Sequence, residues 1–504
     1  MRIGTGSFKG LSLLHPSHLS SPAKTRPLKQ DTSLSESWAI AELQQTRQQV
    51  ETALCSSDGR TPLTAKSSRL SSLPALTASV PLPTCRVSVV IPVRNEEHNL
   101  PAVIKALSHQ IDRVGDRIDR NLYEILVLAN NCTDRTVGVL RALGDRYSSL
   151  QLHVIDVVLP PELAFVGKAR QMAMDEAYRR FALVGASGRI IASTDGDTTV
   201  SANWIASLLE EFDRGIDAVG GRIMTCRMDS HQKMNSDVSL CYLRRVAHAY
   251  LSSQIACLLD PQVHDSWPRH FQFCGANMAV SAEMYGEVDG IPLVRDEEDV
   301  ALYRRLQKAD AKIRHSLAVQ VQTSARQVGR ATGGLSELLT ALSTGERKDA
   351  LVEDPVITEA RIVMRRYLRR IWVALQQESW ASRRSFGVGN YARTAGLLAR
   401  ALGVPVDALR SHIEEAATFG ELMAALSVQQ LEHLESSLFE ATTEISLANT
   451  YLRQRLNRIR KRAAEPVEKL VAASEQIRID DESQSILKAL QQVQAIPLFP
   501  PAYK

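Results

Sequence analysis

The chain has 504 residues, which is enough for two or three domains. Its formal net charge of +4 is small for this length, so the charge does not indicate a nucleic-acid-binding protein. No apolar run is long enough to span a bilayer, and the seven cysteines form no C-x-x-C pair. We therefore expect a cytoplasmic protein that meets a membrane at most at its surface.

The first 84 residues differ in composition from the rest. Residues 1–84 are rich in Ser, Thr, Pro and Leu, which predicts an irregular leader and linker. From Arg86 onward, β-branched apolar runs alternate with amphipathic segments. This alternation predicts right-handed βαβ units, and hence an α/β domain over residues 85–334 with a mostly parallel sheet. The predicted strands span residues 87–93, 124–129, 152–158 and 189–193, and the predicted helices begin near Leu100, Thr133, Gly167 and Trp204.

Residues 335–504 lack strand signals and predict an all-helical C-terminal region. Apolar or small residues recur every seven positions between Leu431 and Ile459, although Arg455 occupies one of these positions. We expect one long helix packed in a hairpin here. Homodimerisation through the C-terminal helices is the minor alternative.

Two carboxylates follow the fourth predicted strand in the segment Asp195-Gly196-Asp197. In an extended chain, residues i and i+2 point to the same side, so both carboxylates would reach one point at the carboxyl end of the strand. Open α/β sheets bind ligands at that end. Two carboxylates there would suit Mg²⁺ or Mn²⁺ held jointly with substrate phosphates. The plain alternative is an Asp-Gly turn without a ligand.

Six motifs in chain order, taken together, resemble family 2 glycosyltransferases of the GT-A fold over residues 86–333. The motifs are Val89-Val-Ile-Pro-Val-Arg-Asn-Glu-Glu97, Leu128-Ala-Asn130-Asn-Cys-Thr-Asp134-Arg-Thr136, Gly167-Lys-Ala-Arg170, Asp195-Gly-Asp197, Gly275-Ala-Asn277 and Glu298-Asp299. The resemblance implies a Rossmann-like, mostly parallel sheet flanked by helices and a nucleotide-diphospho-sugar donor.

The resemblance also implies roles for individual residues. Asp195 and Asp197 form the DxD metal motif, and Asp299 is the catalytic base, which Glu298 orients. Clustered acids raise one another's pKa, which suits a base that works near neutral pH. Donor binding is expected at Pro92, Arg94, Glu96, Asn130, Lys168, Arg170, Asp195, Arg326 and Arg330, and acceptor binding at Asn277 and Trp267.

Two of these assignments leave alternatives open. Glu96 would also be favourable simply as an acid near a helix N-terminus. Asn130 departs from the family, which commonly has Asp at this position to read a uracil N–H. An asparagine oxygen also accepts a hydrogen bond, so the donor base stays open.

The expected function is a metal-dependent, inverting glycosyltransferase of the hexosyltransferase type that transfers a sugar to a hydroxyl group of a glycan, lipid or small molecule. One alternative is a sugar-1-phosphate nucleotidyltransferase. That enzyme would need a Gly-rich basic loop after the first strand, where this chain has Arg94-Asn-Glu-Glu97. The other alternative is a non-catalytic helical scaffold with a relic GT-A domain, which the intact acidic motifs disfavour.

Overall fold

The computed structural model describes residues 69–185, 187–225, 236–324, 340, 351–377, 388–431 and 442–463. All of them belong to one compact unit, residues 59–504. Among these described residues, no helix is both long enough and apolar enough to cross a bilayer.

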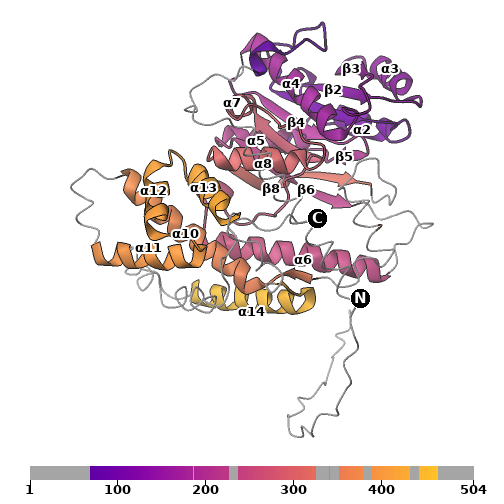
Figure 1. Cartoon of the computed structure of the whole chain (residues 1–504). Coiled ribbons are helices and arrows are strands. Elements are labelled where there is room, and N and C mark those ends of the chain that lie inside the picture. Colours follow the sequence, from indigo (N-terminus) through magenta and orange to yellow (C-terminus); the bar gives the residue numbers. More distant parts are fainter. Residues whose placement is uncertain are drawn as a thin grey trace, which may run out of the picture. The chain divides into compact units, whose positions relative to one another are not determined.

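An eight-stranded sheet forms the centre of the N-terminal half, in the order β3-β2-β1-β4-β7-β6-β8-β5 (Figure 1). The first four strands of this order run parallel, while β7 and β5 are antiparallel to their neighbours. The predicted mostly parallel α/β architecture is therefore confirmed. The strands are β1 (Val87–Val93), β2 (Tyr123–Asn130), β3 (Gln151–Val157), β4 (Ile190–Thr194), β5 (Thr198–Val200), β6 (Ala218–Thr225), β7 (Asn277–Ser281) and β8 (Ile313–Thr323).

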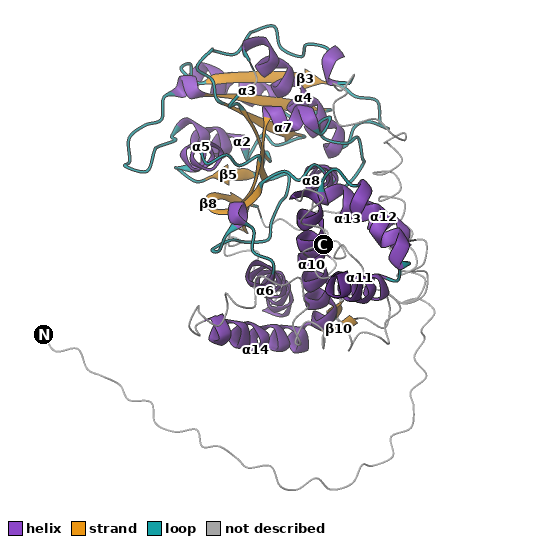
Figure 2. Ribbon diagram, turned by 90° about the vertical axis from the view of Figure 1, so that its left-hand side faces the viewer, coloured by secondary structure: helices purple, strands orange, loops and turns teal. Residues whose placement is uncertain are grey.

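Helices cover both faces of this sheet (Figure 2). Every residue of β1, β2 and β4 is buried, as expected of central strands with helices on both sides. One face packs against α2 (Leu100–Ser108), α3 (Thr136–Arg146) and α5 (Trp204–Asp213). The other face packs against α4 (Val166–Val184), α7 (Ala282–Glu287) and α8 (Glu298–Lys308).

The segment before β1 is irregular, but it packs closely on α4. The Arg69 guanidinium donates to Asp175 at 2.6 Å, and the backbone N–H groups of Leu76 and Thr77 donate to the Glu176 carboxylate. Arg180, which is fully buried, bonds both Glu124 of β2 and residues of this segment. The packed structure thus begins at least sixteen residues before the predicted boundary at residue 85.

The C-terminal region is mainly helical, as predicted, but it is not entirely so. It contains α10 (Pro355–Gln377), α11 (Val388–Leu402), α12 (Val406–Glu415), α13 (Phe419–Leu431) and α14 (Ile445–Ala463). A short antiparallel ribbon joins β9 (Leu351–Glu353) to β10 (Thr442–Glu444). The predicted single helix over residues 431–459 is therefore wrong, because β10 interrupts it and α14 begins only at Ile445.

The helical region contacts the sheet domain through α6 and α8. The long helix α6 (Ser236–Leu259), which follows β6, packs against α10 and α14. Asp310, just after α8, accepts hydrogen bonds from the backbone N–H groups of Phe419 and Gly420, the first residues of α13. An acid at this position satisfies otherwise unpaired N–H groups at the start of the helix. The helix that begins with Glu298 and Asp299 is thereby fixed at its other end to the C-terminal helices.

Candidate functional site

Asp195 and Asp197 lie directly after β4, in a tight turn. The N–H of Thr198 donates to the Asp195 carbonyl at 3.1 Å, and the Asp195 side chain is 33% exposed. A Cβ on Gly196 would lie 2.7 Å from Cγ1 of Val93, so only glycine lets this turn pack against the end of β1. The Thr198 hydroxyl approaches the Asp197 carboxylate and bonds Thr323 at the end of β8. The two residues thus follow the carboxyl end of β4 as predicted, but in a turn and not in the extended conformation that the prediction assumed.

Arg170 of α4 joins this turn to the second acidic motif. Arg170 is 3% exposed, and its guanidinium donates to Asp195 Oδ1 at 2.9 Å and to Glu298 Oε1 at 2.8 Å. It also donates to the hydroxyl of Ser193 and to the carbonyl of Gly275. A Cβ on Gly275 would lie 2.5 Å from the Arg170 Cζ atom, so a side chain there would displace the guanidinium. One buried cation therefore brings the two acidic motifs into a single site.

Glu298 and Asp299 begin α8. The residue before them, Glu297, has a φ of 60°, a left-handed conformation that non-glycine residues seldom adopt. The Asp299 carboxylate accepts hydrogen bonds from the N–H groups of Gly275 and Val300, each at 2.8 Å. Burial, and then the negative charge of Glu298, raise the pKa of Asp299 to about 6, although these hydrogen bonds and Arg170 oppose the shift. A raised pKa suits a carboxylate that takes up a proton as a general base.

Cys274 lies among the same groups, close enough to Asp299 and Asp195 to feel both charges. Burial, and then these two acids, raise the pKa of the Cys274 thiol to about 12, so it is neutral at physiological pH. Tyr242 of α6 hydrogen-bonds Thr225 at the end of β6 and lies near Cys274. The helix α6 therefore borders the site.

The loops after β1 and β2 are held together by side-chain hydrogen bonds. The Asn95 carboxamide pairs with Thr133, the Glu97 carboxylate accepts from the N–H of Arg135, and the Glu96 N–H donates to the hydroxyl of Thr136. The Glu96 side chain is buried and accepts a hydrogen bond from Asn99 at the start of α2. Glu96 thus lies beside the start of α2, and its contact with the donor stays a prediction.

Asn130, the last residue of β2, is 3% exposed. Its side-chain oxygen Oδ1 is buried and has no hydrogen-bond partner within the described ranges. An unpaired buried acceptor is costly, so it marks a position where a ligand N–H would be favourable.

Two other predicted donor contacts lie at the start of α4. Lys168, in its first turn, is half-buried and donates to Gln171 at 3.0 Å. Arg94 is exposed and donates to the carbonyl of Ala164, just before the helix. Pro92 is buried within β1.

The two predicted acceptor residues lie in different surroundings. The Asn277 carboxamide is buried, accepts from the Trp204 indole N–H, and donates to the carbonyls of Arg222 and Val319. Its hydrogen bonds therefore join β7 to α5, β6 and β8. Trp267 is 41% exposed and lies beside Arg314 at the start of β8, whereas the carboxylates lie near the other end of that strand.

Arg326 and Arg330 lie outside the described residues. Two residues of the cluster were missed by the sequence reasoning. Ser193, which bonds Arg170, lies two positions before Asp195 and so shares its side of the strand, a relationship that could have been read from the sequence. Gly275 was noted only as part of a motif, and its carbonyl and N–H contacts give no sequence signal.

Comparison with known proteins identifies the domain that carries this site. The sequence model of the family described as Glycosyl transferase family 2 matches residues 88–270. Residues 88–270 are therefore similar to family 2 glycosyltransferases. The match includes Arg170, Asp195 and Asp197, while Glu298 and Asp299 follow it.

Curated relatives of this family 2 domain are similar over a limited stretch. Glycosyltransferase AglE of Haloferax volcanii is 27% identical over 138 residues, which is 27% of this chain and 39% of the relative. An uncharacterized glycosyltransferase of Mycobacterium bovis is 30% identical over 136 residues, which is 27% of this chain and 48% of the relative. The chain thus spans less than half the length of these relatives.

Solved structures resemble the chain more distantly. A mannosyltransferase of Pyrobaculum calidifontis, in complex with GDP-Man and Mn²⁺, has a TM-score of 0.34 at 16% identity and covers 80% of this chain and 99% of its own. A glucosyl-3-phosphoglycerate synthase of Mycobacterium tuberculosis, in complex with Mn²⁺, UDP and phosphoglyceric acid, has a TM-score of 0.29 at 20% identity and covers 53% and 81%. Scores this low establish neither a common fold nor a common ligand.

Proposed function

We propose that the chain is a divalent-cation-dependent, inverting glycosyltransferase that moves a sugar from a nucleotide-diphospho-sugar donor to a hydroxyl acceptor. One observation carries the proposal. The Arg170 guanidinium bonds both Asp195, of the turn suited to a cation, and Glu298, whose neighbour Asp299 has a raised pKa. Leaving-group stabilisation and proton removal would thus be adjacent, as a sugar transfer requires.

The carboxylates of Asp195 and Asp197 fit a divalent cation that takes its other ligands from the donor. Within the described ranges, no group of three or more His, Cys, Asp or Glu side chains could hold a metal by itself. Mg²⁺ and Mn²⁺ sites commonly use one or two carboxylates together with substrate phosphates and water. When bound, such an ion would neutralise the charge that develops on the leaving diphosphate.

Asp299 would act as the base. The acceptor hydroxyl attacks the anomeric carbon from the side opposite the diphosphate, and its proton passes to the Asp299 carboxylate as the new glycosidic bond forms. Inversion follows from a single displacement of this kind. Glu298 supports the role in two ways, because its charge raises the Asp299 pKa and its carboxylate is fixed by Arg170.

Asn130 would read the nucleobase. Its unpaired Oδ1 accepts a hydrogen bond, and both uracil and guanine carry a ring N–H that could donate one. Lys168 at the start of α4 would contact the diphosphate, since cations beside helix N–H groups form phosphate sites. The predicted donor contacts of Arg94, Arg326 and Arg330 rest only on the resemblance to family 2 glycosyltransferases.

The proposal is tested by incubating the purified chain with a panel of UDP- and GDP-sugars, with Mn²⁺ or with a chelator. Release of nucleoside diphosphate that needs the cation supports a glycosyltransferase. In a parallel incubation with added pyrophosphate, release of a sugar-1-phosphate together with a nucleoside triphosphate would favour a nucleotidyltransferase running in reverse. Absence of any turnover or binding across the panel would favour the scaffold.

A further inference from the structure

The outer face of α14 concentrates positive charge. The helix carries six basic residues and no acidic one, whereas the whole chain has a net charge of only +4. Its inner face, with Leu452 and Leu456, packs against Leu251 and Ile255 of α6. Four cations lie on the exposed side, namely Arg453, Arg458, Arg460 and Lys461.

These cations are available to an external partner. Arg460 donates to Gln254 of α6, and no carboxylate within the described ranges pairs with Arg453, Arg458 or Lys461. By contrast, the basic residue on the inner face, Arg455, is buried and paired with Glu359 of α10. Arg455 is therefore part of the packing between the helices, whereas Arg453, Arg458 and Lys461 are exposed to solvent.

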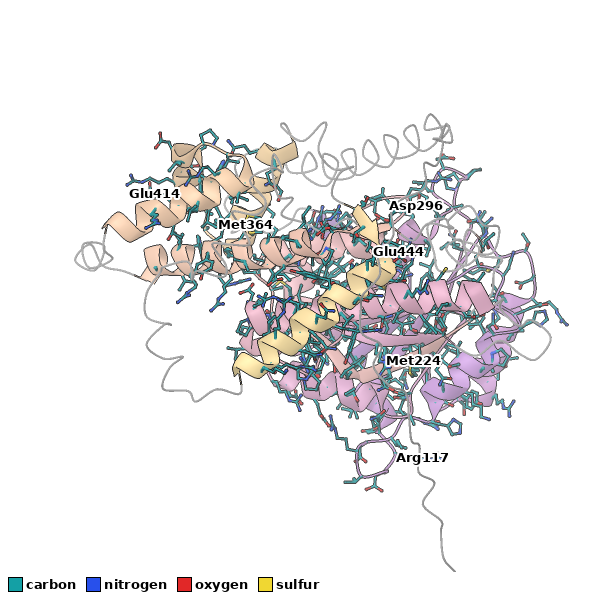
Figure 3. All side chains as sticks on the ribbon, turned by 90° about the horizontal axis from the view of Figure 1, so that it is seen from below. Arg117, Met224, Asp296, Met364, Glu414 and Glu444 are labelled. Carbon is teal, nitrogen blue, oxygen red and sulfur yellow. The ribbon has the colours of Figure 1, made fainter. Side chains whose placement is uncertain are left out.

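Exposed leucines lie at the other end of the same helix pair. Leu240 and Leu243 of α6 are 47% and 60% exposed, and Leu447 of α14 is 66% exposed. The two helices lie alongside each other there, and the Asn449 carboxamide of α14 donates a hydrogen bond to the carbonyl of Arg244 of α6. Figure 3 shows α14 from its outer side, with Glu444 labelled just before its start.

We propose that this surface, formed by Leu240, Leu243, Leu447, Arg453, Arg458, Arg460 and Lys461, docks on an anionic lipid bilayer. A pair of neighbouring helices with exposed basic and apolar side chains suits the headgroup region, where cations meet anionic lipids and leucines enter the acyl boundary. A nucleic acid would use the cations but would gain nothing from three exposed leucines.

The position of α6 gives the docking a consequence for the site. Tyr242 hydrogen-bonds Thr225 and lies near Cys274, which itself lies near Asp195 and Asp299. Leu243 is the next residue along the same helix and is exposed. Docking would thus hold the helix that borders the catalytic cluster close to the membrane surface. The docking itself does not depend on the proposed transfer activity.

Vesicle flotation of the full chain tests the proposal without a sugar nucleotide. We expect the protein to float with phosphatidylcholine vesicles that contain about one-third phosphatidylglycerol, and to be released by high salt. Replacing Arg453, Arg458 and Lys461 by Glu should weaken binding by at least about a hundredfold. The matched control reverses three exposed cations elsewhere, at Lys105, Arg141 and Arg393, and should bind as the wild type does.

A second variant separates the bilayer from other polyanions. Leu243→Ser combined with Leu447→Ser changes only exposed side chains, and should weaken vesicle binding by about tenfold while leaving heparin binding unchanged. The proposal is overturned if the wild type does not float, if it floats equally well with pure phosphatidylcholine, or if the charge-reversed variant and its control bind alike.

Discussion

Nε of Arg170 lies 2.8 Å from Oε1 of Glu298, a residue 128 positions later in the chain. The same guanidinium bonds Asp195, so neither acidic motif is held by its own segment alone. Both side chains of the Arg170–Glu298 pair are less than a tenth exposed. Removal of either partner would leave a buried charge without its counter-ion, which would destabilise the fold. Arg170 is thus better described by its four hydrogen bonds to protein groups than by the predicted contact with donor phosphates.

Replacing Arg170 by Lys should impair both stability and the site. Lysine keeps the charge but cannot form the fork of hydrogen bonds, and we expect a loss of about 1–3 kcal/mol in unfolding free energy. Arg180→Lys is the matched control, because Arg180 is also a fully buried arginine of α4 paired with an acid. Thermal unfolding should detect both losses. In calorimetric titrations with Mn²⁺, the affinity for nucleotide should fall only for Arg170→Lys. An equal fall for Arg180→Lys would show that the loss of affinity comes from reduced stability and not from a role of Arg170 in the site.

Replacing Asp197 by Ala should remove cation-dependent nucleotide binding. The site would lose one of its two carboxylate ligands, and we expect the affinity for UDP or GDP in the presence of Mn²⁺ to fall by about a hundredfold or more. Asp213→Ala removes an exposed acid that pairs with Arg86, and should leave the titration unchanged. An unaltered titration of Asp197→Ala would show that the cation lies elsewhere.

Because the side-chain oxygen of Asn130 is unpaired, two substitutions of this residue should affect nucleotide binding to different degrees. Asn130→Asp keeps an acceptor and should still bind the nucleotide, whereas Asn130→Leu removes it and should weaken binding by about tenfold, the value of roughly one buried hydrogen bond. Titration of both variants with UDP and with GDP would measure this, and would show which base is read. If Leu and Asp behave alike with both nucleotides, Asn130 does not contact the base.

The central strands were predictable because their sequence is unambiguous. Val87–Val93 is a continuous apolar run, and β1 has those same bounds. The strands β9 and β10 are different, since each has three residues and the paired residues are 89 to 93 positions apart. Their pairing is a long-range contact with no local periodicity, so the seven-residue pattern around Leu434 and Leu438 suggested a continuous helix instead.

The acidic motifs of the site were also visible in the sequence, because Asp195, Asp197 and Asp299 occupy short recognisable patterns. The role of Arg170 was not, because it depends on four partners from three separate segments. Asn277 illustrates the opposite case. Its motif indicated a ligand, but all its observed hydrogen bonds are made to the protein core.

The raised pKa of Asp299 predicts a pH dependence. Only the ionised carboxylate can accept the proton, so the rate of donor turnover should rise through a pKa of about 6 and level off above it. Glu298→Gln removes the negative charge that contributes to the shift while keeping an oxygen for Arg170. Its midpoint should therefore move to lower pH in a pH–rate profile. An unchanged midpoint would show that the charge of Glu298 does not affect the pKa of the base.

The most direct test of the account is cation-dependent nucleotide release by the wild type and by Asp299→Asn, measured beside nucleotide binding. Asparagine preserves the size and the hydrogen-bond acceptor of Asp299 but cannot take a proton. We expect binding of nucleotide with Mn²⁺ to be unchanged and turnover to fall by a factor of about 100 to 10,000, the usual contribution of a general base. Turnover that persists at the wild-type rate would contradict the assignment of Asp299 as the base.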